Sequence, residues 1–145
     1  MADFVYTKGM LEMLRGSATG IDWVAASIDM ALFKVAPTED KDDEFVADLA
    51  GETEFADASY SWTNLGTKTL AADLTNDRVT VDHGDVTFSA LAGGEDIVAV
   101  TVQTDTGNDA TARLIYHGDT FTSITTNGSD VVVSPPATGL FYLQV

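Results

Sequence analysis

Residues 97–116 read IVAVTVQTDTGNDATARLIY. Two runs rich in Val, Ile and Thr, Ile97–Thr104 and Ala112–Tyr116, flank the turn residues Thr106–Asp109. β-branched side chains suit the pleated surface of a sheet, and Gly, Asn and Asp suit tight turns. This stretch therefore predicts two neighbouring strands joined by a short loop.

The same pattern extends to both sides of this pair. Short strand candidates recur about every 8–12 residues and are bounded by Gly, Asn, Asp or Pro. Asn127-Gly128 is typical of a type I′ hairpin turn. Towards the N-terminus, Ile28–Val35 alternates apolar side chains until Pro37 stops it. The remaining strand candidates are Ser59–Thr63, Gly66–Leu70, Arg78–Asp82, Val86–Ser89, Asp130–Ser134 and Leu140–Val145.

Two helices are expected in the first third of the chain. Ala2–Arg15 has apolar residues at helical spacing and ends at Gly16. Thr38–Asp48 is strongly acidic and has Phe45 and Val46 at positions that fit one short helix.

These elements predict one domain over residues 1–145. Strands do not alternate with helices, which argues against a doubly wound α/β fold. We expect a mainly β protein, an antiparallel sandwich or jelly-roll-like domain, with an N-terminal helix and one short acidic helix. Residues 1–20 would form the N-terminal helix or arm, and residues 21–145 the β-rich body.

The charge balance excludes several classes of partner. Seven Lys and Arg face 23 Asp and Glu, for a net charge of −16. Nucleic-acid binding requires clustered cations, and an anionic membrane surface would repel this chain. No apolar stretch approaches the roughly 20 residues of a membrane span. We therefore expect neither nucleic acid nor membrane as a partner.

The N-terminus and the cysteine count bear on where the protein is made. The chain has no cysteine, so no disulfide and no thiolate nucleophile is available. Met1–Tyr6 lacks the basic and apolar regions of a signal peptide. We expect synthesis and folding in a cytoplasm.

The motifs that carry catalytic or metal chemistry are missing. Both histidines, His83 and His117, are followed by Gly and are expected to be exposed in turns. There is no Gly-x-Ser-x-Gly elbow. The acidic turns Asp82–Asp85 and Asp105–Asp109 do not match the EF-hand loop. We predict no enzyme activity, no cofactor and no metal site.

Two apolar features leave alternatives open. Trp62 and Tyr60 alternate on a strand, which would suit a sugar-binding face, although we interpret Trp62 as core. The apolar face of Ala2–Arg15 is wider than a helix needs to pack on its own domain. That helix either packs on its own domain alone or is also covered by a partner subunit. We expect the partner contact at Phe4, Tyr6, Met10 and Met13. Phe4 would also touch the domain, together with Leu11 and Leu14.

Several segments, in order along most of the chain, resemble a family of small virion proteins from tailed bacteriophages. They are Lys8-Gly9 in the opening helix, Ile21-Asp22-Trp23, Ile28–Val35, Asp43–Leu49, Gly66–Leu70, Asp85–Ala90, Ile97–Val100, Arg113–Tyr116, Thr126–Val133 and Leu140–Val145. The acidic stretch Thr38–Glu54 and the triplet Ser134-Pro135-Pro136 depart from the pattern of that family.

The resemblance implies a structural role in the virion. The expected function is that of a capsid decoration (cement) protein, which binds the outer surface of the major capsid protein lattice and stabilises the head. Such proteins usually sit on the capsid as homotrimers. The alternative is a tail- or head-fibre-associated protein that recognises a host surface or glycan.

Overall fold

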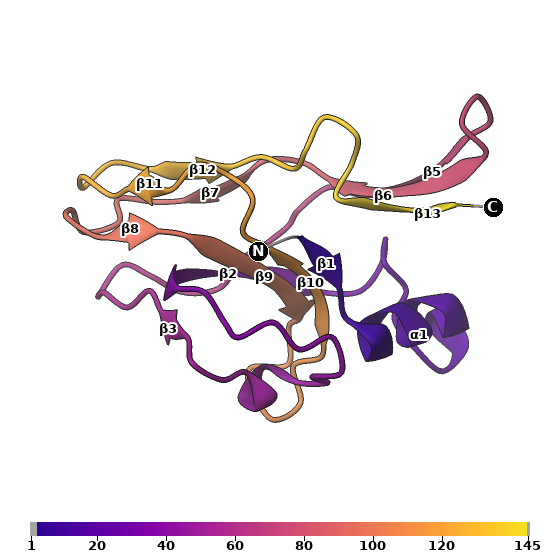
Figure 1. Cartoon of the computed structure of the whole chain (residues 1–145), viewed down its shortest axis with the longest axis horizontal. Coiled ribbons are helices and arrows are strands. Elements are labelled where there is room, and N and C mark those ends of the chain that lie inside the picture. The colour runs from indigo at the N-terminus through magenta and orange to yellow at the C-terminus, as the bar shows by residue number, and fades with distance from the viewer. Residues whose placement is uncertain (1–2, 145) are drawn as a thin grey trace.

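The computed structural model describes residues 3–144 and has two layers of antiparallel strands (Figure 1). The larger sheet has the strand order β1–β10–β9–β2–β3, and β4 also pairs with β2. Its strands are β1 (Phe4–Val5), β2 (Ile28–Val35), β3 (Thr53–Glu54), β4 (Thr63–Asn64), β9 (Ala99–Thr104) and β10 (Leu114–Gly118).

The second layer is built from shorter pieces. A three-stranded sheet has the order β13–β6–β5, and the pair β12–β7 continues towards the other end of the molecule (Figure 1). There β11 pairs with β8, which runs directly into β9 of the larger sheet. Their bounds are β5 (Lys68–Asp73), β6 (Arg78–His83), β7 (Val86–Phe88), β8 (Asp96–Ile97), β11 (Ile124–Thr125), β12 (Val131–Val133) and β13 (Phe141–Gln144). The chain is thus a mainly β, sandwich-like domain, as predicted.

The central strand β2 is buried on both faces, which explains why its apolar pattern is nearly continuous. Ile28, Met30 and Leu32 face the core between the layers. Ala31 and Phe33 face a second apolar cluster on the outer side of the larger sheet. A strand with two covered faces has no reason to carry polar residues at alternate positions.

The N-terminal segment begins as a strand instead of a helix. Phe4 and Val5 pair with His117 and Tyr116 of β10. The helix α1 spans Thr7–Arg15 and is followed by the 3₁₀ turn η1 (Gly16–Ala18). Part of the expected arm is thus built into the sheet, because its backbone bonds to β10. Ala2 and Val145, which begin and end the predicted elements, lie outside the described residues.

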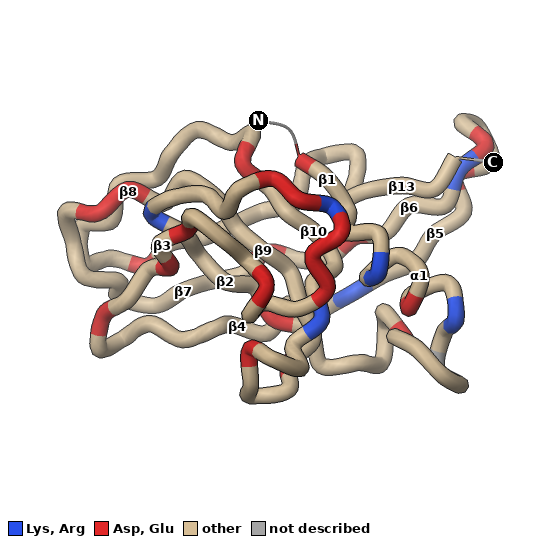
Figure 2. Tube along the Cα trace, turned by 60° about the horizontal axis from the view of Figure 1, so that its bottom comes forward, with Lys and Arg blue, Asp and Glu red and all other residues tan. Residues whose placement is uncertain are grey.

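The predicted acidic helix over Thr38–Asp48 is wrong, apart from one 3₁₀ turn, η2 (Val46–Asp48). Besides a few short-range bonds of its own, the backbone of this segment bonds to the start of β10 and to the residues just before it. The Leu114 amide donates to the Glu44 carbonyl at 3.0 Å, and the Val46 amide donates to the Ala112 carbonyl at 3.0 Å. Tertiary pairing has overridden local helix propensity. The segment lies over the outer face of the larger sheet, where it forms an acidic band (Figure 2).

Asp3 fastens the N-terminus to the loop after β10. Its carboxylate accepts hydrogen bonds from the amides of Asp119 (2.8 Å) and Thr120 (3.0 Å) and from the hydroxyls of Tyr116 (2.9 Å) and Thr120 (2.8 Å). Burial alone would raise the pKa of Asp3, but these bonds outweigh it and hold the pKa below 3.8.

The lowered pKa of Asp3 predicts acid sensitivity. A carboxyl with a depressed folded-state pKa contributes stability above its unfolded pKa, and that contribution disappears as the pH falls through the folded value. We expect Asp3→Asn to lower the free energy of unfolding by about 1–3 kcal/mol at pH 7. The difference from wild type should shrink between pH 5 and 3, as measured by urea unfolding. Glu39→Gln, at an exposed acid, is the control. A loss for Asp3→Asn that is independent of pH would contradict this assignment.

Candidate partner-binding surface

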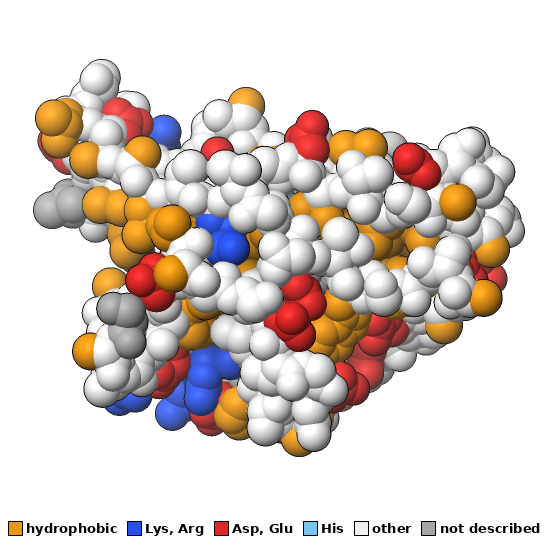
Figure 3. Space-filling model, turned by 180° about the vertical axis from the view of Figure 1, so that it is seen from behind, with side chains coloured by type: hydrophobic (Ala, Val, Ile, Leu, Met, Phe, Trp, Pro, Cys, Tyr) orange, Lys and Arg blue, Asp and Glu red, His pale blue; other side chains and the backbone are white. Residues whose placement is uncertain are grey.

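An open apolar groove separates α1 from the hairpin β5–β6 and from β13. We call it the helix–hairpin groove; its volume is about 300 Å³. Figure 3 shows apolar side chains gathered between the hairpin and the helix. Met10, Met13 and Leu14 line it on the helix side and Ile21 and Trp23 at its base. The sheet contributes Leu70, Val79, Val81 and Leu143.

The sheet side of the groove is apolar because of strand register. Leu70 lies opposite Val81, and Leu143 lies opposite Val79. Residues directly opposite one another in antiparallel strands point to the same face. Alternate residues of three strands therefore form one apolar surface, but α1 covers it only in part: Leu14 is 67% exposed and Leu70 is 51% exposed.

The same sheet also leaves two strand edges open. Among the described residues, β5 and β13 each pair with β6 alone, so their outer edges have no strand partner. Unpaired edges next to exposed apolar side chains are sites where another chain can add a strand. The groove therefore offers both apolar contact and backbone hydrogen bonding.

The charge around the groove differs from that of the rest of the molecule. The flanking elements α1, β5 and β6 carry Lys8, Arg15, Lys68 and Arg78, four of the seven cations in the chain. Their acidic residues are Glu12, Asp73 and Asp82; the turn between β5 and β6 adds Asp77, and Asp22 lines the groove itself. Two of the cations are in ion pairs, Arg15 with Glu12 at 2.7 Å and Arg78 with Asp73 at 2.9 Å. Charge is nearly balanced here, so a partner can approach without the repulsion expected elsewhere.

The structure divides the four residues predicted to contact a partner. Met10 and Met13 line the helix–hairpin groove and are half-buried. Phe4 and Tyr6 are buried within the chain, so the prediction is wrong for these two. Both precede the helix: Phe4 lies in β1, and Tyr6 is the extended residue before Thr7, so helical spacing does not apply to them. Leu11 and Leu14, expected to pack inward, are exposed.

Sequence reasoning missed the sheet half of the groove. Leu70 and Val79 belong to one hairpin, but Leu143 is distant from both in the sequence and meets them only because β13 pairs with β6. The available signal was alternation. Leu70 with Ala72 and Val79 with Val81 mark one apolar face in each strand of the hairpin.

The two histidines are buried, and the expectation of exposed turn residues is wrong for both. Each belongs to a strand: His83 ends β6, and His117 lies within β10. His117 stacks on Phe4 with ring centroids 4.9 Å apart, and its Nε2 is 3.4 Å from Asp119 Oδ2. His83 faces a separate cavity between the layers. The fold thus keeps the two histidines in different environments.

Trp62 is half-buried at a shallow hollow that also includes Tyr60, Ser61 and Asp109. Its indole N–H donates to Glu54 Oε1 at 2.7 Å, and the Tyr60 hydroxyl donates to the same oxygen at 2.7 Å. An aromatic ring with neighbouring acceptors is the kind of surface that suits a sugar. The carboxylate of Glu54 is, however, already engaged by the two aromatic side chains.

Neither a metal site, nor a membrane span, nor similarity to known proteins points to a function. Within residues 3–144, no group of three or more His, Asp or Glu is placed to hold a metal ion. The helices in that range are too short and too polar to cross a bilayer. The chain matches no known protein family, no curated protein and no solved structure.

Proposed function

We propose that this protein is a bacteriophage capsid decoration protein, which binds the outer surface of the major capsid protein lattice and stabilises the head. The helix–hairpin groove is the observation that carries the proposal, because it combines an uncovered apolar surface with two open strand edges. Contiguous apolar patches on a soluble domain mark contacts with other proteins. The resemblance to small phage virion proteins supplies the class of partner.

The distribution of charge supports an orientation on the capsid. The nearly neutral end that carries α1 and the hairpin would face the capsid subunits. The acidic band over the larger sheet would face solvent (Figure 2). A strongly acidic outer surface keeps a protein soluble at high copy number and does not compete for packaged DNA. We propose that the protein occupies the lattice as homotrimers.

Copy number in purified virions tests this role. A decoration protein covers a lattice, so we expect hundreds of copies per particle, measured by quantitative mass spectrometry against the major capsid protein. The count should remain the same when tails are removed from the particles. A dozen copies or fewer, lost with the tail, would contradict the proposal.

A fibre-associated protein that binds a host glycan is the second candidate, and the hollow at Trp62 is the observation that favours it. Fibres attach at few positions, so the same measurement separates the two roles. A low count that follows the tail fraction supports the fibre role.

A further inference from the structure

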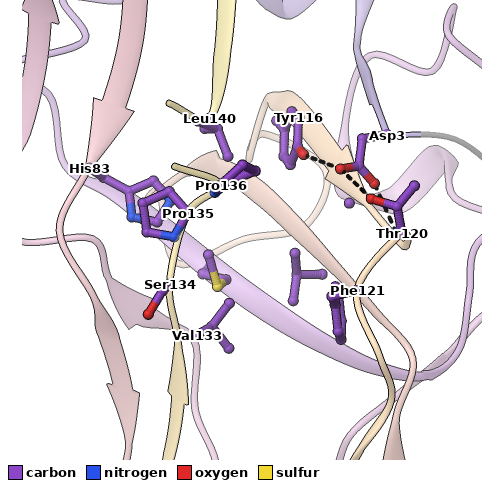
Figure 4. A pocket seen from close by; sticks show the side chains of 13 residues that line it. Asp3, His83, Tyr116, Thr120, Phe121, Val133, Ser134, Pro135, Pro136 and Leu140 are labelled. Carbon is purple, nitrogen blue, oxygen red and sulfur yellow. Dashed lines mark hydrogen bonds between the residues drawn. The ribbon is translucent and has the colours of Figure 1, made fainter. Parts of the chain in front are cut away.

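A second cavity, of about 260 Å³, lies between the two layers. We call it the interlayer cavity. Its apolar wall includes Met30 of β2, Val100 of β9 and Phe121, and the segment Ser134–Pro136 forms part of its rim (Figure 4). Asp3, Tyr116 and Thr120 stand on one side and His83 on the other (Figure 4). The interlayer cavity is distinct from the helix–hairpin groove, and the two have no described lining residue in common.

His83 presents an unused hydrogen-bond acceptor in this cavity wall. Its Nδ1 is 2.6 Å from the Gly84 carbonyl oxygen, so Nδ1 carries the proton and donates it. Nε2 is then an acceptor, and no described residue bonds to it, although the residue is only 5% exposed. Burial lowers the pKa of His83. The hydrogen bond to Gly84 and the negative charges of Asp82 and Asp85 raise it, but burial outweighs them, so the ring is neutral at pH 7. A buried acceptor without a partner calls for a donor.

Three further polar side chains, Asp3, Tyr116 and Thr120, face the cavity as acceptors as well, whereas the Ser134 hydroxyl, which can also donate, belongs to an exposed residue of the rim. The hydroxyls of Tyr116 and Thr120 both donate their protons to Asp3, which leaves only lone pairs to face the cavity. Asp3 adds a negative charge, and none of the described residues that line the space is a Lys or Arg. This arrangement disfavours an anion and favours a group that donates hydrogen bonds and tolerates positive charge.

We propose that the interlayer cavity binds a small amphiphile with an amine head and a compact apolar body. The amine N–H donates to His83 Nε2, and the apolar body packs on Met30, Val100 and Phe121. Apolar walls with a few placed polar groups are typical of small-molecule sites. The inference is independent of the proposed capsid role.

Three probes with one apolar body and different heads test the proposal: 2-phenylethylamine, 2-phenylethanol and phenylacetate. We expect saturable binding of the amine to the full chain, followed by NMR titration at pH 7. The alcohol, which also donates one hydrogen bond, should bind about fivefold more weakly, and phenylacetate should not bind. Equal binding of all three, or of none, would overturn the proposal; in the second case the cavity holds water only.

The ring nitrogens of the wild-type protein give a readout that needs no mutation. The ¹⁵N resonance of His83 Nε2 should move as the amine saturates the site, because that nitrogen gains a hydrogen bond. His117, which lies on the outer side of the larger sheet, is the internal control and should not respond. His83→Phe keeps a ring and removes the acceptor, so it should weaken amine binding about fivefold or more. Binding of the amine without a shift at His83 Nε2 would overturn the assignment.

Discussion

Replacing Gly9 by alanine is expected to lower the free energy of unfolding by about 3 kcal/mol or more. Gly9 is the point at which α1 touches β10. A Cβ atom there would overlap the Leu114 carbonyl oxygen and would lie 2.8 Å from Ile115 Cα. Both are backbone atoms of a strand that is held between β1 and β9, so neither can give way cheaply. Helix propensity favours alanine by about 1 kcal/mol, and the overlap should exceed that gain.

Chemical denaturation followed by circular dichroism measures this effect. Lys8→Ala is the matched control because Lys8 is the exposed neighbour of Gly9 in the same helix. Its effect should stay within about 0.5 kcal/mol. A Gly9→Ala protein that is as stable as wild type would show that α1 does not pack on β10 in this way.

Aspartate at both Leu14 and Leu70 is expected to lower affinity for capsids about 100-fold or more without unfolding the protein. The two side chains stand on opposite walls of the helix–hairpin groove and are more than half exposed, so the fold does not depend on burying them. In the proposed complex they would be buried, and a desolvated carboxylate without a partner is strongly unfavourable. Co-sedimentation of the variant with capsids that lack the protein measures the loss.

Aspartate at both Val35 and Val132 is the matched control. These residues are 49% and 48% exposed, lie in β2 and β12, and do not line the groove. The control adds the same two charges, so it separates a local effect at the groove from general repulsion by a more acidic protein. Equal loss of capsid binding in both variants would contradict a specific contact at the groove.

Strand prediction from sequence succeeded where a strand is long enough to show a pattern. Ile28–Val35 was predicted and forms β2 with the same bounds. The two-residue strands β1, β3 and β11 were missed because two residues cannot display a period. β1 and β3 each stand beside a longer strand, as Phe4 and Val5 do beside β10, whereas β11 pairs with β8, which also has two residues. Ser59–Thr63 illustrates the reverse case, since only Thr63 of it enters a strand.

The acidic segment shows why helical spacing alone misleads. Phe45, Val46 and Leu49 have the right intervals, yet Val46 and Leu49 reach their apolar cluster from a single 3₁₀ turn and the residue that follows it. The hydrogen bonds that decide the outcome come from residues 112–114, and local sequence carries no information about such distant partners.

Only the helix wall of the helix–hairpin groove could be predicted from the sequence, again because local patterns do not reveal distant partners. Met10 and Met13 belong to one helix, so their common face follows from spacing within a single segment. The opposite wall requires knowing that β5, β6 and β13 are neighbours. That pairing brings Leu70 and Leu143 together across more than half of the chain.

A difference map between wild-type virions and virions that lack this gene is the sharpest test of whether the protein decorates the capsid through the helix–hairpin groove. Electron cryo-microscopy at a resolution that separates the two layers would locate the protein and give its orientation. We expect extra density across the outer capsid surface, with α1 and the β5–β6 hairpin against the capsid subunits and the acidic band facing solvent. Density confined to the tail, or capsid density in which the helix–hairpin groove faces solvent, would contradict it.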